Sequence, residues 1–123
     1  MEDYRLGVVE TRFAELVWAN EPISSGELVK LCAKELEWKK STTYTVLKKM
    51  CDKGLFQNVN GTVTALVSQK AFLSGQSRQF VADTFSGSLP AFIAAFADSD
   101  GLSDKDIFDI QRMIEAYRRR HKE

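Results

Sequence analysis

The chain has 123 residues, 44% of them hydrophobic, which suits one compact domain or a small domain with a helical extension. Its 17 basic and 17 acidic side chains give a formal net charge of zero, without the basic excess typical of nucleic-acid-binding proteins. The start, MEDYRLG, has no apolar targeting segment, and no stretch approaches the roughly 18 apolar residues of a membrane span. We therefore expect a cytoplasmic protein with no membrane insertion.

Two short helices are predicted at the start of the chain. The first, over residues 8–19, has an apolar stripe at helical spacing, formed by Val9, Phe13, Leu16 and Val17. Ser24 and Glu27 then have the spacing of a capping box, in which each side chain satisfies a backbone amide at a helix start. A second helix is therefore predicted from this point to about Glu35.

A third helix is predicted over residues 41–53, with Gly54 as its stop signal. If Leu47 points inward, a turn of about 100° per residue places Thr43, Met50 and Cys51 on the same buried face. Short hydroxyls and long lysines, which can donate to phosphates and base edges, then face outward. These outward residues are Thr42, Thr45 and Lys49, with Ser41 and Lys48 toward the flanks.

A β-hairpin is predicted next. The β-prone runs 56–59 and 62–67 are separated by Asn60-Gly61, whose two residues tolerate the positive φ of a tight hairpin turn. Three short helices followed by a hairpin form a winged helix, in which the third helix usually occupies the major groove and the hairpin lies beside the DNA backbone. The expected fold class is therefore mainly α with a small β-hairpin wing, and we assign residues 1–70 to DNA binding.

The remaining residues, 71–123, form a predicted helical dimerisation region. A break is expected at Ser86-Gly87-Ser88, Pro90 opens a short helix, and Ser103 caps the last helix. A tail this short and aromatic cannot bury both of its faces alone, so we expect a homodimer. The alternative is that the tail folds back on its own winged helix. The residues predicted to form the dimer core are Phe80, Phe85, Phe92, Phe96, Ile107, Ile110 and Ile114.

Several segments together resemble the BlaI/MecI family of penicillinase repressors. The third helix carries the signature Trp38, Thr42, Thr43, Tyr44, Thr45, Leu47, Lys48, Lys49, Lys53, Gly54 and Leu55. Phe85-Ser86-Gly87-Ser88 resembles the link to the family's dimerisation helices, and residues 6–18 and 101–103 fit as well. The resemblance implies a dimeric repressor on a palindromic operator of double-stranded DNA that controls β-lactamase, resistance or stress genes. It also implies relief through a membrane sensor metalloprotease pathway that causes cleavage in the dimerisation helices.

By this resemblance, Thr42, Thr45 and Lys49 occupy positions that contact DNA in the family. The full set of residues predicted to bind DNA also includes Lys40, Ser41, Tyr44, Lys48 and Thr62. Ser41 stands where well-known members have Lys, and Tyr44 where they have Gln, so the base preference differs. Gly61-Thr62 replaces a common Gly-Arg in the wing, which should weaken affinity. Ala95-Phe96 occupies the place of the family's scissile Asn-Phe bond, and whether it is cut stays open. The Cys-x-Cys motifs of copper-sensing relatives are absent, so we expect no metal.

The sequence bears on two other classes of function. For an enzyme, the sequence shows no phosphate-binding glycine loop, and the single histidine, His121, lies in a charged tail. Cys32 and Cys51 lie in apolar helical patterns and suggest neither a zinc site nor a disulfide framework, so we expect no enzyme and no cofactor. The stronger alternative is a winged-helix protein-interaction module without specific DNA binding, which the zero net charge and the missing wing arginine favour. Salt dependence separates the two, because phosphate contacts release counterions.

Overall fold

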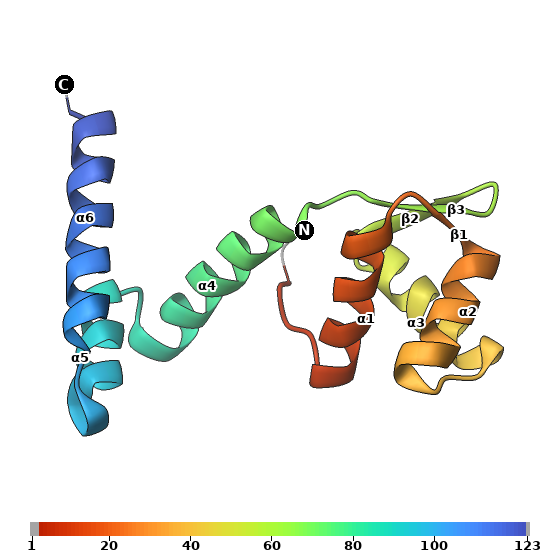
Figure 1. The fold of residues 1–123 in the computed structure, drawn as a ribbon, viewed down its shortest axis with the longest axis horizontal. Coiled ribbons are helices and arrows are strands. Elements are labelled where there is room, and N and C mark those ends of the chain that lie inside the picture. The colour runs from red at the N-terminus through yellow and green to blue at the C-terminus, as the bar shows by residue number, and fades with distance from the viewer. Residues whose placement is uncertain (1–2, 123) are drawn as a thin grey trace. The chain divides into compact units, whose positions relative to one another are not determined.

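A computed structural model describes residues 3–122, and the chain divides into two compact units between Phe80 and Val81. The first unit contains α1 (Val8–Asn20), β1 (Ile23–Ser24), α2 (Ser25–Leu36), α3 (Lys40–Asp52), β2 (Phe56–Val59), β3 (Thr62–Ala65) and most of α4 (Gln69–Phe85), as Figure 1 shows. The second contains the end of α4, α5 (Leu89–Asp100) and α6 (Asp104–Arg120). The predicted fold class, mainly α with a small wing, is confirmed. The assignment of residues 1–70 to DNA binding and of residues 71–123 to dimerisation stays a prediction.

The turns and helix starts follow the chemistry of the sequence. The Ser24 hydroxyl accepts a hydrogen bond from the Glu27 amide (3.1 Å), so α2 begins directly after its predicted cap. Gly54, with φ of 84°, follows α3, which begins one residue earlier than predicted. Asn60 and Gly61, with φ of 52° and 81°, form the hairpin turn between β2 and β3. Both central residues have positive φ, as a tight hairpin requires.

The wing is a three-stranded antiparallel sheet in the order β1-β3-β2. The sequence did not predict β1, whose two residues pair as Ile23 with Val63 and Ser24 with Thr62. A two-residue strand is too short to show an alternating pattern, so only the paired partner reveals it. The amide of Ser25 also donates to the carbonyl of Gly61 (2.8 Å). The turn of the wing is therefore tied to the start of α2.

The core of the first unit draws on each of its helices and on the hairpin. Its buried apolar side chains are Phe13, Ala14, Val17, Leu28, Cys32, Leu47, Met50, Leu55, Phe56, Val63 and Phe72. The predicted inner face of α3 is confirmed, because Thr43 is buried with Leu47 and Met50, and Cys51 is half-buried. Val9 is exposed, contrary to its place in the predicted stripe, because it lies in the first turn of α1, beyond the core.

The second unit has helices with well-defined ends but no buried interior. The hydroxyls of Ser88 and Ser103 accept hydrogen bonds from the amides of Ala91 and Asp106, so each caps the helix that follows it. No residue of α5 or α6 is buried. Over residues 3–122 no single helix is long and apolar enough to cross a membrane, and only α4 and α5 taken together across their break reach such a length.

Candidate nucleic-acid interface

The outer side of α3 forms a continuous polar surface, which we call the recognition face. All of its members are exposed: Lys40, Ser41, Thr42, Tyr44, Thr45, Lys48 and Lys49. Thr42, Thr45 and Lys49 face away from Leu47 and Met50, whose burial in the core fixes the rotation of the helix about its axis. Lys40, seven residues before Leu47, lies on the same side as Leu47 and is exposed because it is the first residue of α3. All seven α3 positions predicted to contact DNA are thus exposed. Contact with DNA itself stays a prediction.

Two hydroxyls of the recognition face already make hydrogen bonds within the protein. Thr45 Oγ1 donates to the carbonyl of Ser41 (2.9 Å), which leaves the threonine oxygen free to accept and its methyl group free for apolar contact. The Tyr44 hydroxyl lies 3.1 Å from Oγ of Ser25 and donates to it, and Ser25 in turn contacts the wing at Gly61. Tyr44 therefore links the recognition face to the start of α2 and to the wing.

Most lysines of α3 and its C-terminal cap have acidic partners. Lys48 pairs with Asp52 at 3.0 Å, one turn along the same helix. Lys49 pairs with Glu10 of α1 at 2.5 Å, and Lys53 lies 3.9 Å from Asp3. Among the residues that the structure describes, Lys39 and Lys40 at the start of α3 have no ion-pair partner. The positive charge available to a polyanion is therefore concentrated at the N-terminal end of the helix.

Glu10 and Asp3 are the residues that sequence reasoning missed at this site. The basic run from Lys39 to Lys53 contains only one acid, Asp52, but folding brings two carboxylates from the distant N-terminal segment against it. The Lys49 ammonium and then the Gly7 amide lower the pKa of the Glu10 carboxyl, because both stabilise its charged form. A Glu in the third position of α1 signals a helix cap, but nothing in the sequence pairs it with Lys49.

The wing presents a neutral edge. Thr62 is exposed in β3 beside the turn, and its neighbours Asn58, Val59 and Asn60 are exposed and uncharged. A hollow of about 250 Å³ lies between the recognition face and the wing, lined by Tyr44, Leu47, Lys48, Cys51 and Asn58. The hollow therefore joins α3 to the wing at Asn58, whereas Thr62 does not line it, and its one charged lining residue comes from α3.

No cluster of three or more histidines, cysteines, aspartates or glutamates that could hold a metal ion occurs in residues 3–122. The two thiols are also poor nucleophiles, because burial raises the pKa of both Cys32 and Cys51 and so disfavours the reactive thiolate. Cys32 and Cys51 thus act as core-packing groups in the winged helix.

The second unit and the last residue of the first, Phe80, expose large apolar side chains. Of the residues predicted to form a dimer core, Phe80, Phe96, Ile107 and Ile114 are exposed, and Phe85, Phe92 and Ile110 are half-buried. The ring centroids of Phe85 and Phe92 lie 5.5 Å apart and those of Phe92 and Phe96 6.1 Å apart, so these three aromatic side chains form one cluster. On α6, Ile107, Ile110 and Ile114 recur at spacings of three and four and so share one face of the helix.

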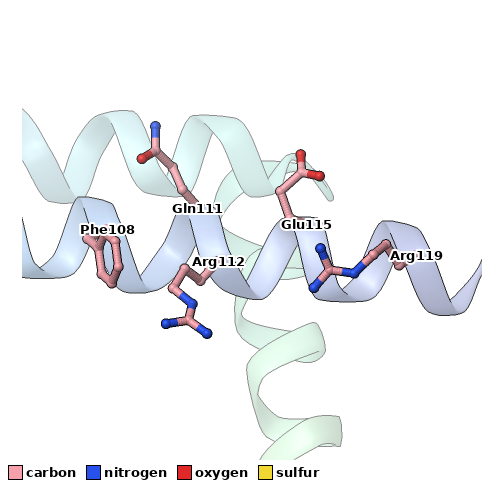
Figure 2. A pocket seen from close by; sticks show the side chains of 5 residues that line it. All are labelled: Phe108, Gln111, Arg112, Glu115 and Arg119. Atoms are coloured by element: carbon pink, nitrogen blue, oxygen red, sulfur yellow. The ribbon is translucent and has the colours of Figure 1, made fainter.

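Another face of α6 carries a shallow hollow of about 310 Å³, lined by Phe108, Gln111, Arg112, Glu115 and Arg119. Figure 2 shows that all five side chains come from this one helix. The Arg112 guanidinium lies 5.6 Å from the centre of the Phe108 ring, a cation–π contact that covers part of the aromatic surface. The hollow is therefore a furrow along one helix and not an enclosed pocket.

The comparisons with known proteins decide the family. Residues 6–116 match the family model described as penicillinase repressor. The chain belongs to the penicillinase repressor family. The penicillinase repressor of Bacillus licheniformis is 25% identical over 118 residues, which cover 93% of this chain and 92% of that protein. Membership makes the chain a DNA-binding transcriptional repressor, a class of regulators and not of enzymes, and it confirms the resemblance found in the sequence.

The ion pair between Glu10 and Lys49 predicts a pH-dependent contribution to stability. Glu10→Gln should lower the free energy of unfolding by about 1 kcal/mol at neutral pH, because it removes a charged partner and a charged helix cap. The folded-state pKa is lowered, so the stabilisation is complete above the ordinary titration range of a glutamic acid and is lost as the pH falls through the lowered pKa. Urea unfolding at several pH values measures this. Glu15→Gln, an exposed position on the same helix, is the control. Equal losses of unfolding free energy in Glu10→Gln and Glu15→Gln at every pH would show that the ion pair between Glu10 and Lys49 does not stabilise the fold.

Proposed function

We propose that two copies of this repressor bind a palindromic operator, with α3 of each copy in the major groove. The observation that carries the proposal is the recognition face, a row of exposed hydroxyl and amine side chains on a helix whose rotation the core fixes. Donors of this kind reach phosphates and base edges together, and the recognition helix of a winged helix lies in the groove.

The N-terminal end of α3 is proposed as the main phosphate contact. Lys39 is the N-cap residue, and no side chain accepts a hydrogen bond from the amides of the first turn. Those amides point along the helix axis and suit a phosphate oxygen, whose negative charge the helix dipole favours. Lys39 and Lys40 add two positive charges at the same end. The threonines of the next turn, Thr42 and Thr45, would then lie against base edges.

The second unit is proposed as the dimerisation element. Helices α5 and α6 have no buried residue, although they carry Phe96, Met113 and Ile114, each more than half exposed. An apolar surface of this kind needs a second layer of protein to remove it from water. A second copy of the chain is the fitting partner, because a palindromic operator has the two-fold symmetry of a homodimer.

Relief of repression is proposed to act on this dimer, through a sensor signal or proteolysis. The candidate bond Ala95–Phe96 lies within α5, and the Phe96 side chain is exposed. A bond inside a helical turn enters a protease only after local opening, and α5 offers little resistance because it buries no residue. Cleavage at this bond would separate α6 from the DNA-binding unit. The repressor would then lose the higher affinity that comes from binding two half-sites at once.

A protein-interaction module is the second candidate. The neutral wing and the ion pairs of Lys48, Lys49 and Lys53 favour it, because they reduce the positive charge offered to DNA. Such a module would bind its partner through apolar and polar contacts and respond little to salt. The slope of affinity against salt therefore distinguishes the candidates.

Lys40→Ala should weaken operator binding and flatten its salt dependence by roughly one unit of slope, as expected for one lost phosphate contact. Titrations of operator DNA at several salt concentrations measure both quantities. Lys105→Ala, which makes the same change of charge on α6, is the matched control and should leave the slope unchanged. An unchanged slope for Lys40→Ala would remove this lysine from the interface.

Ile114→Asp should dissociate the dimer, because a carboxylate buried between two helices without a partner costs several kcal/mol. Sedimentation equilibrium of the purified variant measures the dimer population. The control is Lys105→Asp, which places a carboxylate nine residues earlier on the opposite face of α6. If Ile114→Asp sediments as an intact dimer, this face of α6 is not the interface.

A further inference from the structure

Residues 3–6, which we call the strap, contact both the C-terminal cap of the recognition helix and α4. At the α3 end, the Lys53 ammonium donates to the carbonyl of Arg5 (2.9 Å) and lies 3.9 Å from the Asp3 carboxylate. Asp3 in turn accepts hydrogen bonds from the amide and the side chain of Arg5 (2.9 and 3.1 Å), which hold the strap in a tight bend. The strap is therefore fixed to the C-terminal end of α3.

At its other attachment, Tyr4 binds α4 through three kinds of contact. Its amide donates to Oε1 of Gln79 (3.0 Å), and its carbonyl accepts from Nε2 of Gln76 (3.2 Å). Its ring lies 5.6 Å from the ring of Phe72, measured between centroids. Phe72, Gln76 and Gln79 recur at helical spacing, so Tyr4 lies along one face of α4.

Gly75 is the position on this face that admits the tyrosine. A Cβ atom at Gly75 would lie 2.2 Å from Cε1 and Cζ of Tyr4, far inside van der Waals contact. Glycine in a helix interior is less favourable than alanine, so its presence in the middle of α4 goes against helix propensity. The close approach of the Tyr4 ring accounts for it.

The strap supplies much of what holds α4 to the winged helix. Phe72 is the one residue of α4, over Gln69–Phe85, that is buried in the core. One buried side chain fixes the position of a helix but leaves it free to rotate and tilt about that point. The contacts of Tyr4 with Gly75, Gln76 and Gln79 add a second region of contact, one to two turns further along α4.

We infer that the strap sets the spacing between half-sites that the dimer accepts, with Tyr4 and Gly75 as the positioning residues. The inference rests on the proposed dimeric function. Helix α4 continues without a break from the DNA-binding unit into the second unit. Its attachment to α3 through the strap therefore limits how far the two recognition helices of a dimer can move to fit a different half-site spacing. A dimer whose two winged helices are rigidly attached binds half-sites at one spacing and binds other spacings more weakly.

Gly75→Ala tests this without weakening α4, because alanine raises helix propensity while its methyl group displaces Tyr4. Binding is measured on the operator, on operators whose spacer is longer or shorter by one or two base pairs, and on a single half-site. Affinity for the native operator should fall about tenfold, because a more mobile α4 lowers the effective concentration of the second winged helix at its half-site. Binding to the single half-site should stay unchanged, and discrimination against wrong spacers should shrink.

Two further variants complete the experiment. Tyr4→Ala should reproduce the effect, and the double variant should show no added loss, since both changes break one contact. Gly26→Ala, at a helical glycine with open space around it, is the control and should keep the wild-type spacing profile. Amide hydrogen exchange without DNA gives an independent measure, because the bonded Tyr4 amide should exchange faster in Gly75→Ala.

Two results would overturn the role of the strap. One is an unchanged exchange rate at Tyr4 in Gly75→Ala, which would show that the contact of the Tyr4 ring with Gly75 does not hold the strap on α4. The other is a wild-type spacing profile in Gly75→Ala despite faster exchange, which would show that the contact does not control spacing. Failure of the proposed dimeric function has a different signature, since the wild-type protein would then bind the palindrome no better than a single half-site.

Discussion

The burial of Leu47 and Met50 fixes the rotation of α3 about its axis, and the rest of the site depends on this constraint. A helix has one exposed face once its opposite face is held in a core. Thr42, Thr45 and Lys49 are therefore presented together, and Lys48 on the flank of this face also lines the hollow beside the wing. A change that lets α3 rotate would disturb each contact at once, even if every surface residue remained in place.

Folding also redistributes the charge of a chain whose net charge is zero. Glu10 and Asp3 approach the C-terminal half of α3, whereas the lysines at its start keep their charge unpaired within residues 3–122. The result is a gradient along the helix, with the positive end at the N-terminus, where the helix dipole also favours anions. In the proposed complex, affinity for phosphate would then depend on a few positions at the start of α3.

Features that depend on local chemistry could be predicted from the sequence. The cap at Ser24, the turn at Asn60-Gly61 and the break before Ser88 each rest on one or two residues with a special backbone or side-chain role. The inner face of α3 follows from helical spacing. Strand β1, the partner of Lys49 and the contact of Tyr4 with Gly75 depend on residues far apart in the sequence, so no local pattern reveals them. Gly75, a glycine in the middle of α4, is the one feature of the sequence that points to the contact with Tyr4.

The most direct test is an equilibrium titration of the purified full-length protein against its own upstream promoter DNA and a scrambled duplex, at two salt concentrations. A dimeric repressor that reads DNA through α3 predicts tight binding that favours the promoter and weakens steeply as salt rises. Equal and feeble binding to both duplexes, with little response to salt, would contradict it and favour a winged helix that binds protein.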